Sequence, residues 1–209
     1  MTELLTNFIS TVLQIIVFAL IPYIFYLFRK DKGETFFHYI GLYSSSGKSF
    51  FYVILASLIF ITAGIGMIFI DANIRAVVIS PPTVTGKLRQ MGFNLNSIII
   101  LLLIALLKTS FSEEIFFRGF IARRLMSIFG FQTGNILQAI IFGLVHLVLF
   151  GIMTKAMLMP LIFIFIFSTT AGWVIGYIKE RYAGGSIIPG WIAHGVGNAL
   201  SYAIIAFVI

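Results

Sequence analysis

The sequence has 209 residues, of which 60% are hydrophobic and only 10% are charged. Soluble globular domains carry about 25% charged residues, so the composition excludes that class, and the 23 phenylalanines exclude a solvated, disordered chain. The net charge of +7 does not indicate nucleic-acid binding, because the cations lie between apolar segments, where they set helix orientation and contact lipid headgroups. The sequence therefore predicts an all-α, polytopic transmembrane helix bundle with the lipid bilayer as its surroundings.

Six apolar segments are each suited to cross a bilayer, which takes about 20 residues per helix. Backbone polar groups must be satisfied within each segment in lipid, so these segments are predicted to be helices rather than strands. Two further segments, Thr35–Ser46 and Ile115–Phe131, could be interfacial helices, and the second could instead continue the third span, so six to eight helices are compatible with the sequence. The six predicted spans are Leu4–Phe28, Ser49–Ile70, Ser97–Arg118, Asn135–Phe150, Ala156–Ile178 and Ile187–Ile209.

The stretch Asp71–Asn96 is the extended segment of lower hydrophobicity, and it contains Ser80-Pro81-Pro82. It is predicted to be a connector rather than a lid. We therefore divide the chain into residues 1–96, with two spans and this loop, and residues 97–209, with the other spans and the candidate catalytic core.

The cations of the short loops predict the orientation of the spans in a cell membrane. More of them fall on one side, which is therefore predicted to be cytoplasmic, with both termini outside. Glu113 is then expected near the cytoplasmic end of its span, and the active site is expected to open toward the cytoplasm. The cytoplasmic set is Arg29, Lys30, Lys32, Lys48, Arg123, Arg124, Lys179 and Arg181, and the opposite set is Arg75, Lys87, Arg89 and Lys155.

Glu113 and Glu114 are acidic residues inside an apolar segment, between Ile98–Leu107 and Ile115–Phe117. A charge deep in a span costs about 2.5–3.5 kcal/mol on insertion scales, so a compensating interaction is needed. Glu114 and Arg118 are four residues apart and can pair on one helix face, whereas Glu113 is rotated away from that face. We expect Glu114 and Arg118 to form a supporting ion pair and Glu113 to face the interior of the bundle.

Two of the three histidines, His146 and His194, also lie within predicted spans. Asn198 follows His194 by four residues, so their side chains face the same way on a helix. Glycine and alanine residues around them allow neighbouring helices to approach closely. A shared polar centre would satisfy these three side chains and Glu113 inside a bilayer.

The chemistry of this set favours hydrolysis of an amide by water. A carboxylate beside a neutral imidazole can hold a water molecule and take its proton, and His194 and Asn198 can donate hydrogen bonds to an oxyanion that develops on a carbonyl. The chain has no cysteine, and Ser112 does not face its neighbour Glu113 on a helix. Glu113 is therefore the candidate general base.

Three motifs in chain order resemble those of the CPBP (Abi) family of intramembrane proteases: Glu113-Glu114-x-x-x-Arg118, Phe142-x-x-x-His146 and His194-x-x-x-Asn198. That family includes the type II CAAX prenyl endopeptidases and bacterial proteins linked to bacteriocin processing and self-immunity. The resemblance covers roughly residues 108–199, and the first 95 residues show no match.

The resemblance implies three pairs of roles: water activation by Glu113 with His146, oxyanion stabilisation by His194 with Asn198, and support by Glu114 with Arg118. Both a metal-free and a metal-dependent mechanism are ascribed to the family. We favour a mechanism without a cofactor, because the sequence has no H-E-x-x-H pair. In the alternative, zinc would be bound by Glu113, His146 and His194.

The expected partner is a peptide substrate at the membrane. It would be a membrane-associated peptide or a protein terminus, such as a CAAX-like tail, a bacteriocin or a signal peptide. Two other functions stay open at this point. One is a non-catalytic immunity or interaction protein on the same scaffold, and the other is a transporter or proton relay, because buried Glu and His serve those roles as well.

Overall fold

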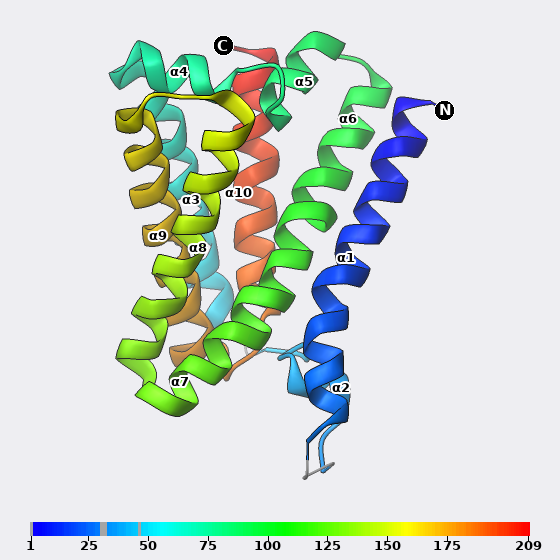
Figure 1. The fold of residues 1–209 in the computed structure, drawn as a ribbon, viewed down its shortest axis with the longest axis vertical. Helices are drawn as coiled ribbons and strands as arrows, with labels where there is room; N and C mark the ends of the chain where they lie inside the picture. The colour runs from blue at the N-terminus through cyan, green and yellow to red at the C-terminus, as the bar shows by residue number, and fades with distance from the viewer. Residues whose placement is uncertain (1, 30–32, 46) are drawn as a thin grey trace.

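A computed structural model describes residues 2–29, 33–45 and 47–209, and the secondary structure in these residues is helical throughout (Figure 1). The prediction of an all-α bundle is therefore confirmed. The helices are α1 (Glu3–Leu27), α2 (Phe36–Tyr39), α3 (Lys48–Ile70), α4 (Ala72–Val78), α5 (Val84–Met91), α6 (Leu95–Leu102), η1 (Leu103–Phe111), η2 (Glu114–Ala122), α7 (Arg123–Phe129), α8 (Phe131–Thr154), α9 (Leu158–Arg181) and α10 (Ile188–Phe207).

Five helices in the described part of the chain are long and apolar enough to cross a membrane. They are Glu3–Leu27, Ser49–Ile70, Leu95–Phe129, Phe131–Thr154 and Leu158–Arg181. The sixth predicted span is the 20-residue helix α10, which is less apolar because it contains His194, Asn198 and several glycines. It still runs along the bundle beside α3 (Figure 1).

The third span is longer than the predicted Ser97–Arg118, and the alternative that Ile115–Phe131 continues this span is confirmed as far as Phe129. α6, η1, η2 and α7 form one helix of 35 residues, Leu95–Phe129. Glu113 lies near its middle, so the expectation that Glu113 is near the end of its span is wrong. The sequence prediction ended the span at the charged Arg118, but the structure pairs this charge internally with Glu114, and the helix continues.

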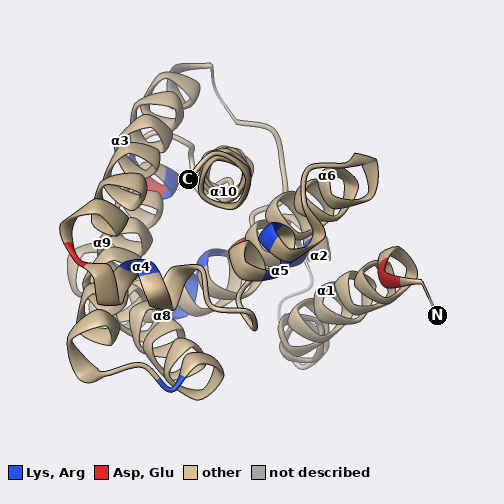
Figure 2. Cartoon of the chain, turned by 90° about the horizontal axis from the view of Figure 1, so that it is seen from above, with Lys and Arg blue, Asp and Glu red and all other residues tan. Residues whose placement is uncertain are grey.

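α1 packs on this long helix, while α8 and α9 pack on each other and α10 packs between α3 and η1. Seen along the bundle, α1 lies at one edge, on the side away from α3 and α9 (Figure 2). Most of the side chains of α1 are exposed, as expected for a helix that contacts lipid. The start of α1 and the end of α10 lie at the same end of the bundle (Figure 1), which agrees with the predicted placement of both termini on one side.

The connector Asp71–Asn96 is folded into α4 and α5. The Asp71 carboxylate accepts hydrogen bonds from the backbone N–H groups of Asn73 and Ile74 and so caps α4. The Thr83 hydroxyl donates to the Val78 carbonyl. Of the predicted interfacial helix Thr35–Ser46, only α2 is helical, and Ser46 lies outside the described residues, as do Lys30 and Lys32.

Glu34 joins the end of α1 to α2 and α7. Its carboxylate oxygens lie 2.5 Å from Arg29 Nη1, 2.7 Å from His38 Nδ1 and 3.4 Å from Arg123 Nη2. Burial raises the pKa of Glu34, but the hydrogen bonds from His38 and Arg29 and the charges of Arg123 and Arg29 together bring it below the ordinary value of 4.5. The ionised form of Glu34 therefore stabilises this end of the bundle.

Replacing Glu34 with glutamine should lower stability at neutral pH by up to about 1 kcal/mol, because its partners are partly exposed. A carboxylate with a lowered folded-state pKa contributes its full stability above the unfolded-state pKa and loses it as the pH falls through the folded-state value. The difference between wild type and Glu34→Gln should therefore shrink below pH 4.5. Thermal unfolding in detergent across this range measures it, and a difference that stays constant down to low pH would contradict the ion-pair account.

Candidate active site

Glu113 and Glu114 lie where the two π-helical segments meet. η1 ends at Phe111 and η2 begins at Glu114. A π-helix is bonded from i to i+5 and is wider than an α-helix, and such segments are frequent at functional sites. The wider turn changes which side chains share a face, so the direction of Glu113 does not follow from an α-helical projection.

Glu114 and Arg118 form the predicted ion pair. Arg118 Nη1 lies 3.3 Å from Glu114 Oε1, and both side chains are 0% exposed. The guanidinium also lies over the Phe142 ring, 4.1 Å from its centroid. Glycines make room for the pair, because a Cβ atom on Gly190 would lie 3.0 Å from Glu114 Oε2 and one on Gly172 would lie 3.5 Å from Arg118 Nη2.

His194 bridges the two glutamates. Its Nδ1 lies 3.2 Å from Glu114 Oε1, and its Nε2 lies 3.8 Å from Glu113 Oε2. A carboxylate accepts hydrogen bonds, so Nδ1 is the donor in this contact with Glu114. Glu114 therefore orients the imidazole as well as neutralising Arg118, and this second contact was not predicted.

Glu113 and His146 line one pocket of about 380 Å³ between α1, the long helix and α8. His146 Nδ1 donates to the Phe142 carbonyl at 2.8 Å, because a carbonyl only accepts. When the ring carries a single proton, Nε2 is therefore its acceptor nitrogen. The carboxylate and this imidazole thus share a cavity, as required for holding a water molecule between them.

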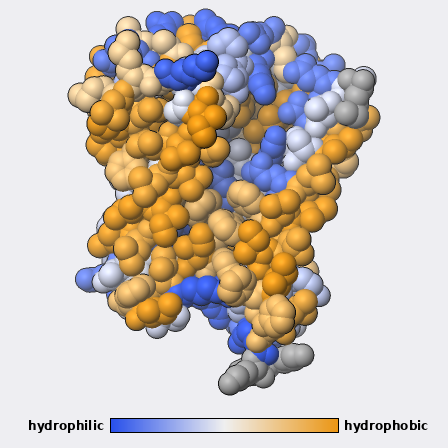
Figure 3. Space-filling view, in the orientation of Figure 1, coloured by the Kyte–Doolittle hydropathy of each residue, from blue (hydrophilic) through white to orange (hydrophobic). Residues whose placement is uncertain are grey.

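The pocket opens on a lipid-facing part of the surface. Its lining includes Leu13 and Val17 of α1 and Val145 and Leu149 of α8, and all four are exposed apolar side chains. Figure 3 shows hydrophilic residues in a recess of this face, framed by apolar surface. A segment embedded in the bilayer can therefore reach the pocket from the side.

The hydrogen bonds that the structure gives the Asn198 side chain run to η1 and not to His146 or His194. The Asn198 amide Nδ2 donates to Thr109 Oγ1 at 3.2 Å and to Ser110 Oγ at 3.3 Å. These hydroxyls in turn donate to the carbonyls of Ile104 and Ala105. Asn198 thus joins α10 to η1, and in this arrangement both of its N–H groups already have acceptors.

The zinc alternative requires three protein donors close together. In the ranges that the structure describes, no three His, Asp or Glu side chains lie close enough together to hold a metal ion. Glu113, His146 and His194 therefore do not fit a three-ligand zinc site in this arrangement, and no step is derived through a metal. That the reaction needs no cofactor stays a prediction.

Apart from Glu113 and His146, the residues that line the pocket were not identified from the sequence, and two of them are close to the proposed chemistry or polar. Gln14 comes from α1, in the part of the chain that showed no motif, and Phe117 comes from the long helix. The signal for Gln14 was present, because a polar side chain within an apolar run marks a function or a partner. Phe142, part of one motif, lies between the two histidines, with its ring centroid 4.3 Å from that of His146 and 6.1 Å from that of His194.

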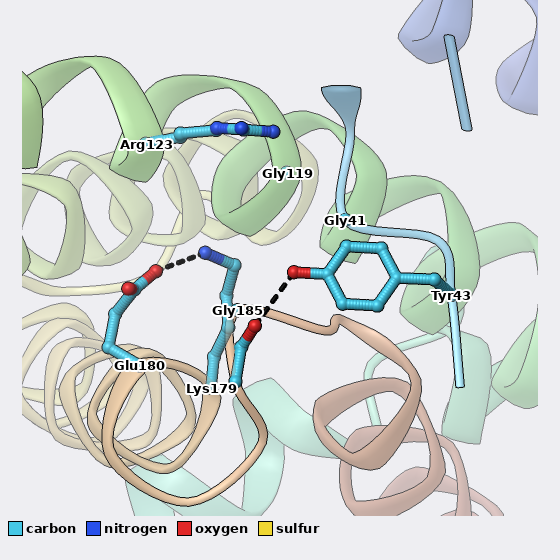
Figure 4. A pocket seen from close by; sticks show the side chains of 8 residues that line it. Gly41, Tyr43, Gly119, Arg123, Lys179, Glu180 and Gly185 are labelled. Atoms are coloured by element: carbon cyan, nitrogen blue, oxygen red, sulfur yellow. Dashed lines mark hydrogen bonds and ion pairs between the residues drawn. The ribbon is translucent and has the colours of Figure 1, made fainter. Parts of the chain in front are cut away.

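A second pocket, of about 240 Å³, is lined by charged side chains that already have partners within the protein (Figure 4). The buried Lys179 pairs with Glu180, and Arg123 donates to the carbonyls of His38 and Tyr39. The Tyr43 hydroxyl donates to the Gly184 carbonyl at 2.8 Å. Burial is the largest influence on the Tyr43 hydroxyl and raises its pKa. The hydrogen bonds of the residues lining this second pocket connect the loops at this end of the bundle, and the pocket shares no residue with the Glu113 pocket.

A comparison with protein-family models identifies the family of this chain. The family model described as "Type II CAAX prenyl endopeptidase Rce1-like" matches residues 95–200, which is half of the chain. The matched residues include all six side chains proposed from the motifs. No curated protein matches the chain, and no solved structure matches it either. The chain belongs to the Rce1-like type II CAAX prenyl endopeptidases, within the CPBP family that its motifs resemble.

Proposed function

We propose that the protein is an intramembrane endopeptidase that hydrolyses a peptide bond with a water molecule activated by Glu113 and His146. The observation that carries this proposal is the pocket that these two side chains line inside the bundle, with its opening toward lipid. The family match supports a membrane protease in general, and the pocket supports this particular assignment of residues.

The proposed reaction begins with a water molecule held between the Glu113 carboxylate and His146 Nε2. Glu113 takes a proton from the water as its oxygen bonds to the substrate carbonyl carbon, and the carbonyl electron pair moves to the oxygen. The C–N bond then breaks, and the proton on Glu113 passes to the leaving amine. The carboxylate is thereby regenerated for the next cycle.

The oxyanion needs hydrogen-bond donors where its charge develops. His194 is one candidate donor, because its Nε2 lies 3.8 Å from Glu113 Oε2. A proton on Nε2 would make this nitrogen a hydrogen-bond donor, while Nδ1 stays bonded to Glu114. Asn198 can serve as the second donor by exchanging its bond to Thr109 or Ser110 for the oxyanion.

The proposed substrate is a membrane-associated peptide or a protein terminus, with the CAAX-like tail named by the family description as the first candidate and bacteriocins and signal peptides as others. The apolar rim of the pocket suits a hydrophobic segment. The end of the bundle with Arg123, Arg124, Lys179 and Arg181 is proposed to face the cytoplasm, which places His194 nearer to that side because α10 begins there.

His146→Ala should reduce kcat/KM for a bilayer-embedded peptide by roughly 100-fold or more, because it removes one of the two groups that hold and polarise the water. The measurement uses purified protein in lipid vesicles and follows product by mass spectrometry. His38→Ala is the matched control, since His38 lies outside both pockets and should keep wild-type turnover. Wild-type turnover by His146→Ala would contradict the role of His146 in activating the water, whereas no cleavage by wild type itself would support a non-catalytic protein on this scaffold.

A further inference from the structure

α1 is held to the long helix by polar side chains within the apolar bundle. Gln14 Nε2 donates to the Lys108 carbonyl at 2.7 Å and to Ser112 Oγ at 3.1 Å. One turn earlier, Ser10 Oγ accepts a hydrogen bond from Lys108 Nζ at 3.0 Å. Of these two residues of α1, only Gln14 also lines the Glu113 pocket.

The partners of Gln14 fix which branch of its amide faces the helix. The Lys108 carbonyl can only accept, and the Ser112 hydroxyl gives its own proton to that same carbonyl, so it too accepts from Gln14. The amide nitrogen therefore points at η1, and the oxygen occupies the other branch. Within the described chain, no group donates a hydrogen bond to this oxygen.

The free amide oxygen of Gln14 could accept a hydrogen bond from a backbone N–H group of a peptide substrate, which has no water to bond to inside a membrane. A segment must be extended for its scissile carbonyl to reach Glu113, and extension releases backbone N–H groups from helical hydrogen bonds. No bulk water is present in the hydrocarbon region to satisfy them, so each N–H without an acceptor carries a free-energy cost. Glu113 and His146 Nε2 are occupied with the water in the proposed reaction, which leaves Gln14 as the acceptor on the α1 wall.

We propose that Gln14 is a substrate-positioning residue, whose amide oxygen accepts a hydrogen bond from one backbone N–H of an extended peptide in the Glu113 pocket. The inference rests on the proposed function. It assigns to α1, which lies outside the matched residues 95–200, a direct part in holding the substrate.

An ester scan of the substrate tests this proposal. A cleavable peptide is prepared as a series in which one amide at a time near the scissile bond is replaced by an ester, which removes one N–H. In wild type, the ester at one position should lower kcat/KM by about tenfold, the effect of one hydrogen bond. Gln14→Met is matched in length but has no acceptor oxygen. In this variant the ester peptide and the all-amide peptide should have the same kcat/KM.

Two further variants separate positioning from the attachment of α1. Ser10→Ala removes the Lys108 Nζ–Ser10 link outside the pocket and should keep the wild-type ester profile. Gln14→Glu, assayed at a pH low enough for its carboxyl group to be protonated and to donate to the Lys108 carbonyl, keeps an oxygen on the free branch and should keep the ester penalty. A wild-type ester profile in Gln14→Met at every position would overturn the proposal, and so would loss of the penalty in Ser10→Ala.

The proposed function and the role of Gln14 fail in different ways. If wild type does not cleave the all-amide peptide, or if Glu113→Gln cleaves it normally, the proposed function is wrong and the inference falls with it. If wild type cleaves the peptide, Glu113→Gln does not, and the ester penalty is the same with and without Gln14, only the inference is wrong.

Discussion

Glu113→Gln should abolish peptide hydrolysis, with a loss in kcat of roughly 10³-fold or more, because the amide cannot take the proton from the attacking water and general bases contribute about 10²–10⁴-fold. The substitution keeps the size of the side chain and its place between η1 and η2. Substrate binding should therefore persist, and the loss should appear in kcat rather than in KM. Single-turnover cleavage in vesicles, together with binding of a labelled peptide, measures both quantities.

The matched control is Glu3→Gln, the same chemical change in the first turn of α1. It should leave kcat at the wild-type value, and both variants should unfold at temperatures close to that of wild type. Normal turnover by Glu113→Gln in protein that is folded and binds peptide would remove the water-activation mechanism.

Arg118→Leu should cause the largest loss of stability. It leaves the Glu114 carboxylate fully buried without its arginine, and removing one partner of a buried ion pair costs about 3–5 kcal/mol. The cation also contacts the Phe142 ring, and a leucine side chain in its place would retain only part of that packing. Thermal unfolding in detergent and the yield of folded protein measure the effect.

The double variant Glu114→Leu with Arg118→Leu is the informative comparison. It removes both charges, so it should recover a substantial part of the stability lost in Arg118→Leu, as found when buried ion pairs are replaced by apolar residues. It should nevertheless be inactive, because His194 then loses the carboxylate 3.2 Å from its Nδ1. A double variant less stable than Arg118→Leu would show that the ion pair is not the source of the effect.

Interactions within one helix were the part of the site that could be predicted from sequence. Glu114 and Arg118 pair as expected because residues four apart are neighbours on a helix. The predicted spans also correspond closely to helices, since long apolar segments in lipid have few alternatives. The predicted end of the third span was wrong because a paired arginine does not terminate an apolar helix.

Contacts between helices were less predictable. The bridge from His194 to both glutamates depends on how α10 packs against η1 and η2, and the π-helical hydrogen bonding leaves no plain periodic pattern in the sequence. The hydrogen bonds from Asn198 to Thr109 and Ser110 of η1 were likewise not predicted. Gln14 is visible in the sequence as a polar residue within an apolar run, but its partners Lys108 and Ser112 lie 94 and 98 residues away and could not be assigned from sequence.

The polarity of α10 has a consequence for biogenesis. This helix falls below the hydropathy of the five candidate spans, so it enters lipid alone at a greater free-energy cost than they do. Its neighbours α3 and η1 precede it in the sequence and therefore leave the ribosome first. Because α3 and η1 are synthesised first, α10 can insert against a protein surface rather than into lipid alone. A circular permutation that moved α10 ahead of α3 would remove this surface at the time of insertion.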